Sequence, residues 1–255
     1  NVNQKIQFYG IQVEDDFDKG IALTMDTPVK NNSIVVFPEY SIIDSPLQNH
    51  QLEKKIINFI KKIDSYFIFG CVEFTPEAKK PFNNIALIYS PEGKLLGKFQ
   101  KHHPIQFFVD GEPGKGYPVF KTEIGTLGIG MCYDFDYVDV ARNLTKKGAE
   151  VLIAPTMDAL SWGKTQHIQH ASMMPFRAVE TGRFLFRPAS SGISMVVSPE
   201  GKILKEIGFN KTGVLDYEVP LLNHKTFYVR YGYLLPYLIH LICGLLIVIG
   251  LVKRY

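Results

Sequence analysis

The sequence is poor in the features that mark several classes of protein. Only three cysteines occur in 255 residues, and Cys71, Cys132 and Cys243 have neither metal-ligand spacing nor an obvious pairing. A disulfide framework is therefore not expected. The formal net charge is only +3 at pH 7, which is too small to indicate nucleic-acid binding. No signal-like segment follows the first residue, and no linker or low-complexity stretch precedes about residue 221.

What the sequence does contain is typical of a folded domain. Hydrophobic residues make up 46% and charged residues 21%, which excludes broad disorder. This length can bury one large hydrophobic core or two modest ones. The first residue is Asn1 rather than Met, so we expect a processed product or one part of a longer protein. Gly125, Gly128 and Gly130 lack the third spaced glycine of a dinucleotide-binding motif, and no cofactor is expected.

A long hydrophobic run stands at the C-terminus. Residues 231–252 read YGYLLPYLIHLICGLLIVIGLV, which is long enough to cross a bilayer as one helix. A buried core helix is the alternative, but such a helix is rarely this long and uncharged. We therefore divide the chain into a catalytic domain, 1–225, and a transmembrane helix with a short basic tail, 226–255. Lys253 and Arg254 favour a cytoplasmic C-terminus and an extracytoplasmic domain at the cell membrane, although basic residues also precede the run.

The rest of the chain alternates short β-rich runs with helical ones. We expect strands over 5–13, 33–37, 66–73, 84–90, 95–100, 117–122, 125–131, 150–154, 184–189, 192–198 and 213–218. We expect helices over 50–64, 136–148 and 164–182. Two similar strings, YSPEGKLLG at 89–97 and VSPEGKILK at 197–205, predict equivalent tight turns between apolar strands. Together these patterns predict one α/β domain with mixed sheets, followed by a tail helix.

Three of the expected strands end on a reactive side chain. Glu39 follows SIVVF, Lys101 follows LLGKFQ and Cys132 follows GTLGIGM. Because strand ends of α/β sheets converge in space, we expect the three side chains to meet. The carboxylate would take the thiol proton, the thiolate would attack a carbonyl, and the ammonium would stabilise the oxyanion. A lone cysteine after a strand is more often a core residue, but the combination predicts that Cys132 is an activated nucleophile.

These motifs resemble those of the carbon–nitrogen hydrolase (nitrilase) superfamily. The strings that carry the resemblance are FPEYS, FNNIALIYSPEGK, GKFQKHH, GIGMCYD and MMPFRAVETGRFLFRPASSGIS, and it covers nearly all of 5–218. The resemblance implies a four-layer α-β-β-α sandwich. It also implies Glu39 as the base, Lys101 as the oxyanion stabiliser and Cys132 as the nucleophile.

A narrower resemblance is to apolipoprotein N-acyltransferases, the membrane branch of this superfamily. It rests on KHH at 101–103, RAVETGR at 177–183 and FYVRYGYLLPYL at 227–238. It implies that Cys132 takes an acyl chain from a phospholipid as a thioester and passes it to the N-terminal amine of a lipoprotein.

Two positions depart from that branch. Asp134 stands where the branch usually has Glu, and the resulting CYD is more similar to soluble amidases. The branch has a second acidic residue eight positions after its lysine, where this chain has Val109. Asp110 or Glu112 would have to serve instead, and we favour Asp110.

Two groups of possible metal ligands are assigned structural roles. Three aspartates after the cysteine lack the glycine and terminal glutamate of a calcium loop, and we expect them to form an acidic face at a helix start. Two histidines three residues apart lack a further ligand motif, and we expect them on the polar face of a helix. These residues are Asp134, Asp136, Asp139, His167 and His170. No metal site is predicted.

Three functions remain open. The first is a membrane-attached acyltransferase, and the second is a membrane-anchored amidase in which water resolves the acyl-enzyme. The third is a catalytically silent scaffold, which has no physical need for the intact trio of Glu39, Lys101 and Cys132. Beside that trio, we expect Tyr133 to adjoin the nucleophile and Trp162 to line the pocket. The oligomeric state is not predicted.

Overall fold

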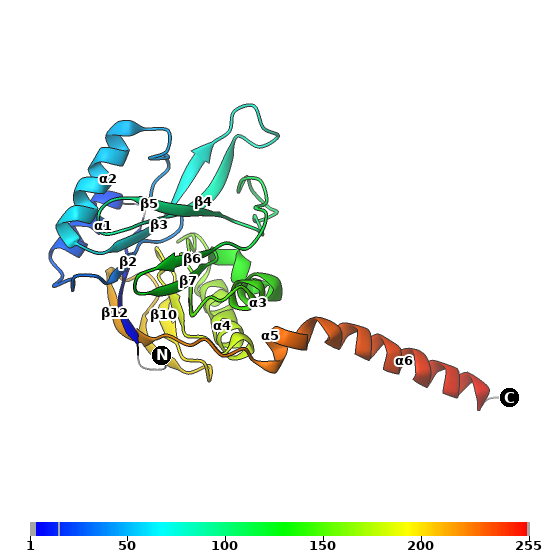
Figure 1. The fold of residues 1–255 in the computed structure, drawn as a ribbon. Coiled ribbons are helices and arrows are strands. Elements are labelled where there is room, and N and C mark those ends of the chain that lie inside the picture. Colours follow the sequence, from blue (N-terminus) through cyan, green and yellow to red (C-terminus); the bar gives the residue numbers. More distant parts are fainter. Residues whose placement is uncertain (1–3, 15, 254–255) are drawn as a thin grey trace.

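The computed structural model describes residues 4–14 and 16–253, so Arg254 of the expected basic tail lies outside the described residues. Two six-stranded sheets pack face to face, and helices cover both outer faces (Figure 1). This arrangement confirms the four-layer α-β-β-α sandwich.

The two sheets share one plan. Their strand orders are β12-β1-β2-β3-β4-β5 and β11-β10-β9-β8-β7-β6, each with three central parallel strands and antiparallel strands on both sides. The first sheet contains β1 (Lys5–Gln12), β2 (Ile34–Val36), β3 (Tyr66–Phe74), β4 (Phe82–Tyr89), β5 (Leu95–Gln100) and β12 (Gly213–Pro220). The second contains β6 (Val119–Thr122), β7 (Gly125–Ile129), β8 (Val151–Ile153), β9 (Leu185–Arg187), β10 (Ser194–Val197) and β11 (Ile203–Ile207).

The two SPEGK strings occupy equivalent places in this plan. They form the β4–β5 and β10–β11 hairpins, at corresponding ends of the two sheets. Gly93 and Gly201 have φ values of 80° and 81°, which favour glycine over residues with a side chain. The predicted equivalence of the two turns is confirmed.

Helices cover each sheet on its outer face. The first sheet carries α1 (Phe17–Met25) and α2 (His50–Ile63), and the second carries α3 (Val138–Lys146) and α4 (Lys164–Thr181). Helix α2 buries Ile56, Phe59, Ile60 and Ile63 on one side, as its apolar spacing predicts. The expected helix over 136–148 is α3, which begins at Val138 and ends at Lys146, and a 3₁₀ turn, η1 (Cys132–Asp136), precedes it.

Aromatic contacts fill the layer between the sheets. The rings of Phe8 on β1 and Phe186 on β9 lie 4.9 Å apart between centroids. A Cβ atom at Gly10 would come within 2.8 Å of the Phe186 ring, so this glycine permits the close approach of the sheets. The tight packing holds the strand ends of both sheets in fixed positions.

The C-terminal segment leaves the domain as a helix. It comprises α5 (Phe227–Tyr231), the 3₁₀ turn η2 (Gly232–Leu234) and α6 (Leu235–Val252). Thr226 caps α5 and donates a hydrogen bond to the Glu180 carbonyl on α4, which anchors the start of the segment. Helix α6 then projects away from the sandwich with exposed side chains (Figure 1). Phe227–Val252 is long and apolar enough to cross a membrane.

Candidate active site

Two strand ends of the first sheet and one of the second bring Glu39, Lys101 and Cys132 together. Glu39 follows β2, Lys101 follows β5 directly, and Cys132 follows β7. All three are almost fully buried. A Cβ atom at Gly70 of β3 would lie 2.4 Å from the Cα atom of Glu39, so this glycine makes room for the Glu39 backbone.

A buried ion cluster surrounds Lys101. Its Nζ atom lies 2.8 Å from Glu39 Oε1 and 2.7 Å from Asp110 Oδ2. The Asn84 amide donates to both carboxylates, at 2.7 and 2.8 Å, and the Tyr40 hydroxyl donates to Asp110 at 2.5 Å. Burial alone would raise the pKa of Asp110, but Lys101 and its hydrogen bonds hold that pKa below its usual value. Both carboxylates are therefore compensated by one ammonium.

The structure distinguishes the two acidic candidates after Lys101. Asp110 contacts the ammonium directly, whereas Glu112 presents its backbone carbonyl to the Gln100 amide. Asn84 and Tyr40 complete the cluster, and sequence analysis gave neither of them a role. Asn84 stands in the string FNNIALIYSPEGK and lies within β4. Nothing in the spacing of that strand distinguishes a polar residue of the site from one that faces solvent.

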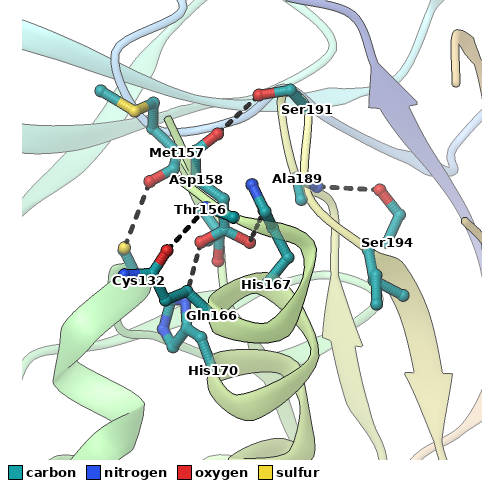
Figure 2. A network of polar contacts seen from close by, with 12 residues as sticks. Cys132, Thr156, Met157, Asp158, Gln166, His167, His170, Ala189, Ser191 and Ser194 are labelled. Carbon is teal, nitrogen blue, oxygen red and sulfur yellow. Dashed lines mark hydrogen bonds and ion pairs between the residues drawn. The ribbon is translucent and has the colours of Figure 1, made fainter. Parts of the chain in front are cut away.

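The backbone around Cys132 is constrained. Its φ is 47°, in the left-handed region that residues with a side chain rarely adopt, and its N–H donates to the Pro155 carbonyl at 3.0 Å. The thiol points to the Met157 carbonyl, with Sγ 3.6 Å from that oxygen (Figure 2). The N–H of Met157 in turn donates to Glu39 Oε2 at 3.1 Å. The backbone of Met157 thus contacts both the Cys132 thiol and the Glu39 carboxylate.

The surroundings of Cys132 favour the protonated form of its thiol. Burial, followed by the negative charge of Glu39, raises the pKa of the Cys132 thiol well above its ordinary value, and Lys101 offsets this only in part. The pKa shift therefore favours the thiol over the thiolate in the resting site. Sequence analysis could not show this, because burial is a property of the folded chain.

Asp134 organises the loops rather than forming part of an acidic helix face. Its Oδ1 atom accepts the backbone N–H groups of His102 and His103, at 3.0 and 2.8 Å, and its Oδ2 accepts that of Met131 at 2.9 Å. Burial raises the pKa of Asp134 to about 6, although these hydrogen bonds act to lower it. This carboxylate therefore ties the chain after Lys101 to the chain before the nucleophile.

Replacing Asp134 with alanine is expected to lower the free energy of unfolding by about 3 kcal/mol, because three buried N–H groups lose their acceptor. Turnover should fall as well, since the loops of Lys101 and Cys132 lose their connection. Asp134→Asn, which keeps one acceptor oxygen, should give an intermediate loss. Thermal unfolding in detergent measures both variants, and a loss below about 1 kcal/mol in Asp134→Ala would contradict the role.

Beside the nucleophile lies a cavity of about 370 Å³. Aromatic and aliphatic side chains form much of its wall, and Tyr133 and Trp162 line it as sequence analysis expected. The lining residues are Ile105, Phe107, Phe108, Cys132, Tyr133, Asp136, Trp162, Gln166 and His170. Phe107 is 92% exposed, so an apolar edge of the cavity faces outward. The cavity can receive a largely apolar group next to the thiol.

The two histidines of α4 are not ordinary polar-face residues. His167 is fully buried, and His170 lines the cavity with Nδ1 2.7 Å from Asp158 Oδ1. Asp158 also binds Arg187, whose Nη2 lies 2.8 Å from Oδ2. Sequence analysis missed Asp158 and Arg187, because they are distant from Cys132 in the chain. Arg177 and Glu180 form a separate ion pair on α4, at 3.0 Å.

Cys132, Asp158 and His170 each offer a ligand atom, and these atoms lie within 4.8 Å of one another. Such a set could hold a metal ion. Arg187 already supplies a positive charge to Asp158, however, which opposes a cation at this position.

Comparisons with known proteins agree with this architecture. The carbon–nitrogen hydrolase family matches residues 4–224. The chain is 30% identical over 247 residues to apolipoprotein N-acyltransferase 2 of Treponema denticola, covering 84% of this chain and 46% of that one. It is 27% identical over 198 residues to an omega-amidase of Xenopus laevis, covering 69% of this chain and 68% of that one. The crystal structure of a carbon–nitrogen hydrolase from Helicobacter pylori superposes with a TM-score of 0.72 at 21% identity, covering 86% and 90% of the two chains.

The fold and the family match together define a nitrilase-superfamily enzyme with a cysteine at its candidate site. The chain belongs to the carbon–nitrogen hydrolase family. It spans about half the length of the curated acyltransferases that it matches.

Proposed function

We propose that the chain catalyses acyl transfer through a thioester on Cys132, from a phospholipid to the N-terminal amine of a lipoprotein. The observation that carries this proposal is the thiol itself, which lies between the buried Glu39–Lys101–Asp110 cluster and an apolar cavity. Acyltransferase relatives and the terminal apolar helix support a lipid donor.

In the first step, Glu39 takes the proton of Cys132 while Sγ attacks the ester carbonyl carbon of the donor. The Lys101 ammonium donates to Glu39 and Asp110, which leaves its third N–H for the carbonyl oxygen as negative charge develops there. The C–O bond then breaks, Glu39 returns the proton to the leaving alcohol, and the acyl group remains on Cys132 as a thioester. An amine attacks this carbonyl in the second step and displaces the thiolate, which regains a proton.

We further propose that 1–225 forms the catalytic domain and that 226–255 holds it at the cell membrane. Helix α6 begins where α5 rests against the domain, so the catalytic site stays close to the bilayer. Lys253 is consistent with a cytoplasmic C-terminus and an extracytoplasmic domain. Protection of the domain from protease added outside intact cells would contradict this orientation.

Amide hydrolysis is the second candidate, and the omega-amidase relative and the CYD string favour it. The two functions differ in what resolves the thioester. We expect a peptide with an S-diacylglyceryl N-terminal cysteine to take the acyl group at least about tenfold faster than water does. The same peptide with an acetylated amine is the matched control. Equal release of free fatty acid with both peptides, with no acylated peptide, would favour the hydrolase.

A further inference from the structure

The cavity beside Cys132 has a polar end that the proposed acylation step does not use. Asp136 and His170 form part of its lining, whereas Glu39 and Lys101 do not. A second substrate that approaches the thioester through this cavity therefore meets Asp136 and His170. Among the described residues that line the cavity there is no lysine or arginine.

The imidazole of His170 is held in one orientation. Its Nδ1 atom lies 2.7 Å from Asp158 Oδ1, and Figure 2 shows the ring pointing to that carboxylate. Burial would raise the pKa of Asp158, but Arg187 and His170 hold it below its ordinary value, so the carboxylate is charged. This contact turns the Nδ1 side of the ring toward Asp158, which leaves Nε2 as the ring nitrogen closest to Asp136.

Two polar atoms at this end of the cavity lack a hydrogen-bond partner among the described residues. They are His170 Nε2 and Asp136 Oδ1, which lie 3.4 Å apart, close enough for an ion pair when His170 is protonated. The other charged or titratable groups near His170 are Cys132, Asp158, Arg187 and His167. His167 contacts Asp158 Oδ2 at 3.6 Å. Buried polar atoms without partners cost about 1–3 kcal/mol each, which a ligand with several N–H donors would offset. A primary ammonium carries three such donors.

We propose that Asp136 and His170 form the subsite for the amine acceptor, an inference that rests on the proposed acyl transfer. Asp136 binds the incoming ammonium, and His170 Nε2 takes one of its protons. The neutral amine then attacks the thioester carbonyl, so that a C–N bond forms and the C–S bond to Cys132 breaks. The second amine proton passes to the departing thiolate. The residues therefore select an amine over water as the acceptor.

The test separates the second step from the first. Each chain is first acylated with a p-nitrophenyl fatty acyl ester, and the isolated thioester is followed by intact mass, with and without the S-diacylglyceryl cysteine peptide. We expect Asp136→Asn to lower the ratio of amine transfer to hydrolysis by about 10- to 100-fold, the loss expected of one hydrogen bond to a charged group. His170→Gln should lower the same ratio.

Asp139→Asn is the matched control. It removes the same charge three positions along the chain, but its carboxylate contacts His103 and Tyr117 rather than the cavity. We expect its ratio to match that of the native chain. An unchanged ratio in Asp136→Asn and His170→Gln, while the native chain transfers to the peptide, would overturn the subsite alone. A native thioester that decays equally with and without the peptide would overturn the proposed function and the subsite with it.

Discussion

Replacing Lys101 with methionine is expected to lower the free energy of unfolding by about 3–5 kcal/mol and to abolish turnover. The ammonium is only 1% exposed and contacts both Glu39 and Asp110, so its removal leaves two buried carboxylates without a cation. Methionine retains most of the volume, so the loss measures charge rather than packing. Thermal unfolding in detergent gives the stability.

The loss in Lys101→Met should depend on pH. Without the ammonium, burial and the neighbouring Glu39 carboxylate raise the folded-state pKa of Asp110 above its unfolded value. Asp110 is protonated in acid, so the loss should be small near pH 4 and should grow as pH rises through the raised pKa. Adding Asp110→Asn should recover part of the stability but no activity.

Lys98→Met is the matched control for this prediction. Lys98 lies on β5, three positions before Lys101, and pairs with Glu73 at 2.7 Å, but it is 45% exposed. Exposed pairs contribute about 1 kcal/mol or less, so this variant should retain stability and turnover. Equal losses in Lys98→Met and Lys101→Met would contradict the account of the buried cluster.

Replacing Cys132 with alanine is expected to lower turnover by at least about 10⁴-fold, as removal of a covalent nucleophile does in other enzymes. The fold should persist, because the thiol makes only one weak hydrogen bond. Initial rates with a phospholipid donor and the lipopeptide measure the loss.

Cys71→Ala is the control for loss of a buried thiol. Cys71 is fully buried within β3 and does not line the cavity beside Cys132, so it takes no part in the proposed chemistry. We expect a modest loss of stability and unchanged turnover. Turnover that survives in Cys132→Ala would rule out a thioester on this residue.

The fold and the ion cluster were predictable because local patterns mark them. Short apolar runs show where strands end. Lys101 stands directly after such an end, and Glu39 stands three positions after one. Helix α1 was missed because it is short and carries Gly20 in its middle, a residue that weakens helices in isolation. In the fold, Gly20 lies against the ring of Phe37, where a Cβ atom would come within 2.7 Å.

The polar end of the cavity could not be predicted in the same way. His170 and Asp136 are remote in sequence and have ordinary helical and loop spacing, and only the packing of α4 beside η1 brings them together. The protonated state of the Cys132 thiol is likewise a consequence of burial. Residue type and spacing identify the nucleophile, but the three-dimensional surroundings determine its resting state.

The most direct test of the central claim is the intact mass of the native chain after incubation with phospholipid, compared with Cys132→Ala. We expect a mass increase of one fatty acyl chain in the native protein, removed by hydroxylamine and absent from the variant. An adduct that persists in Cys132→Ala, or no adduct with phospholipid, would contradict a phospholipid-derived thioester on Cys132.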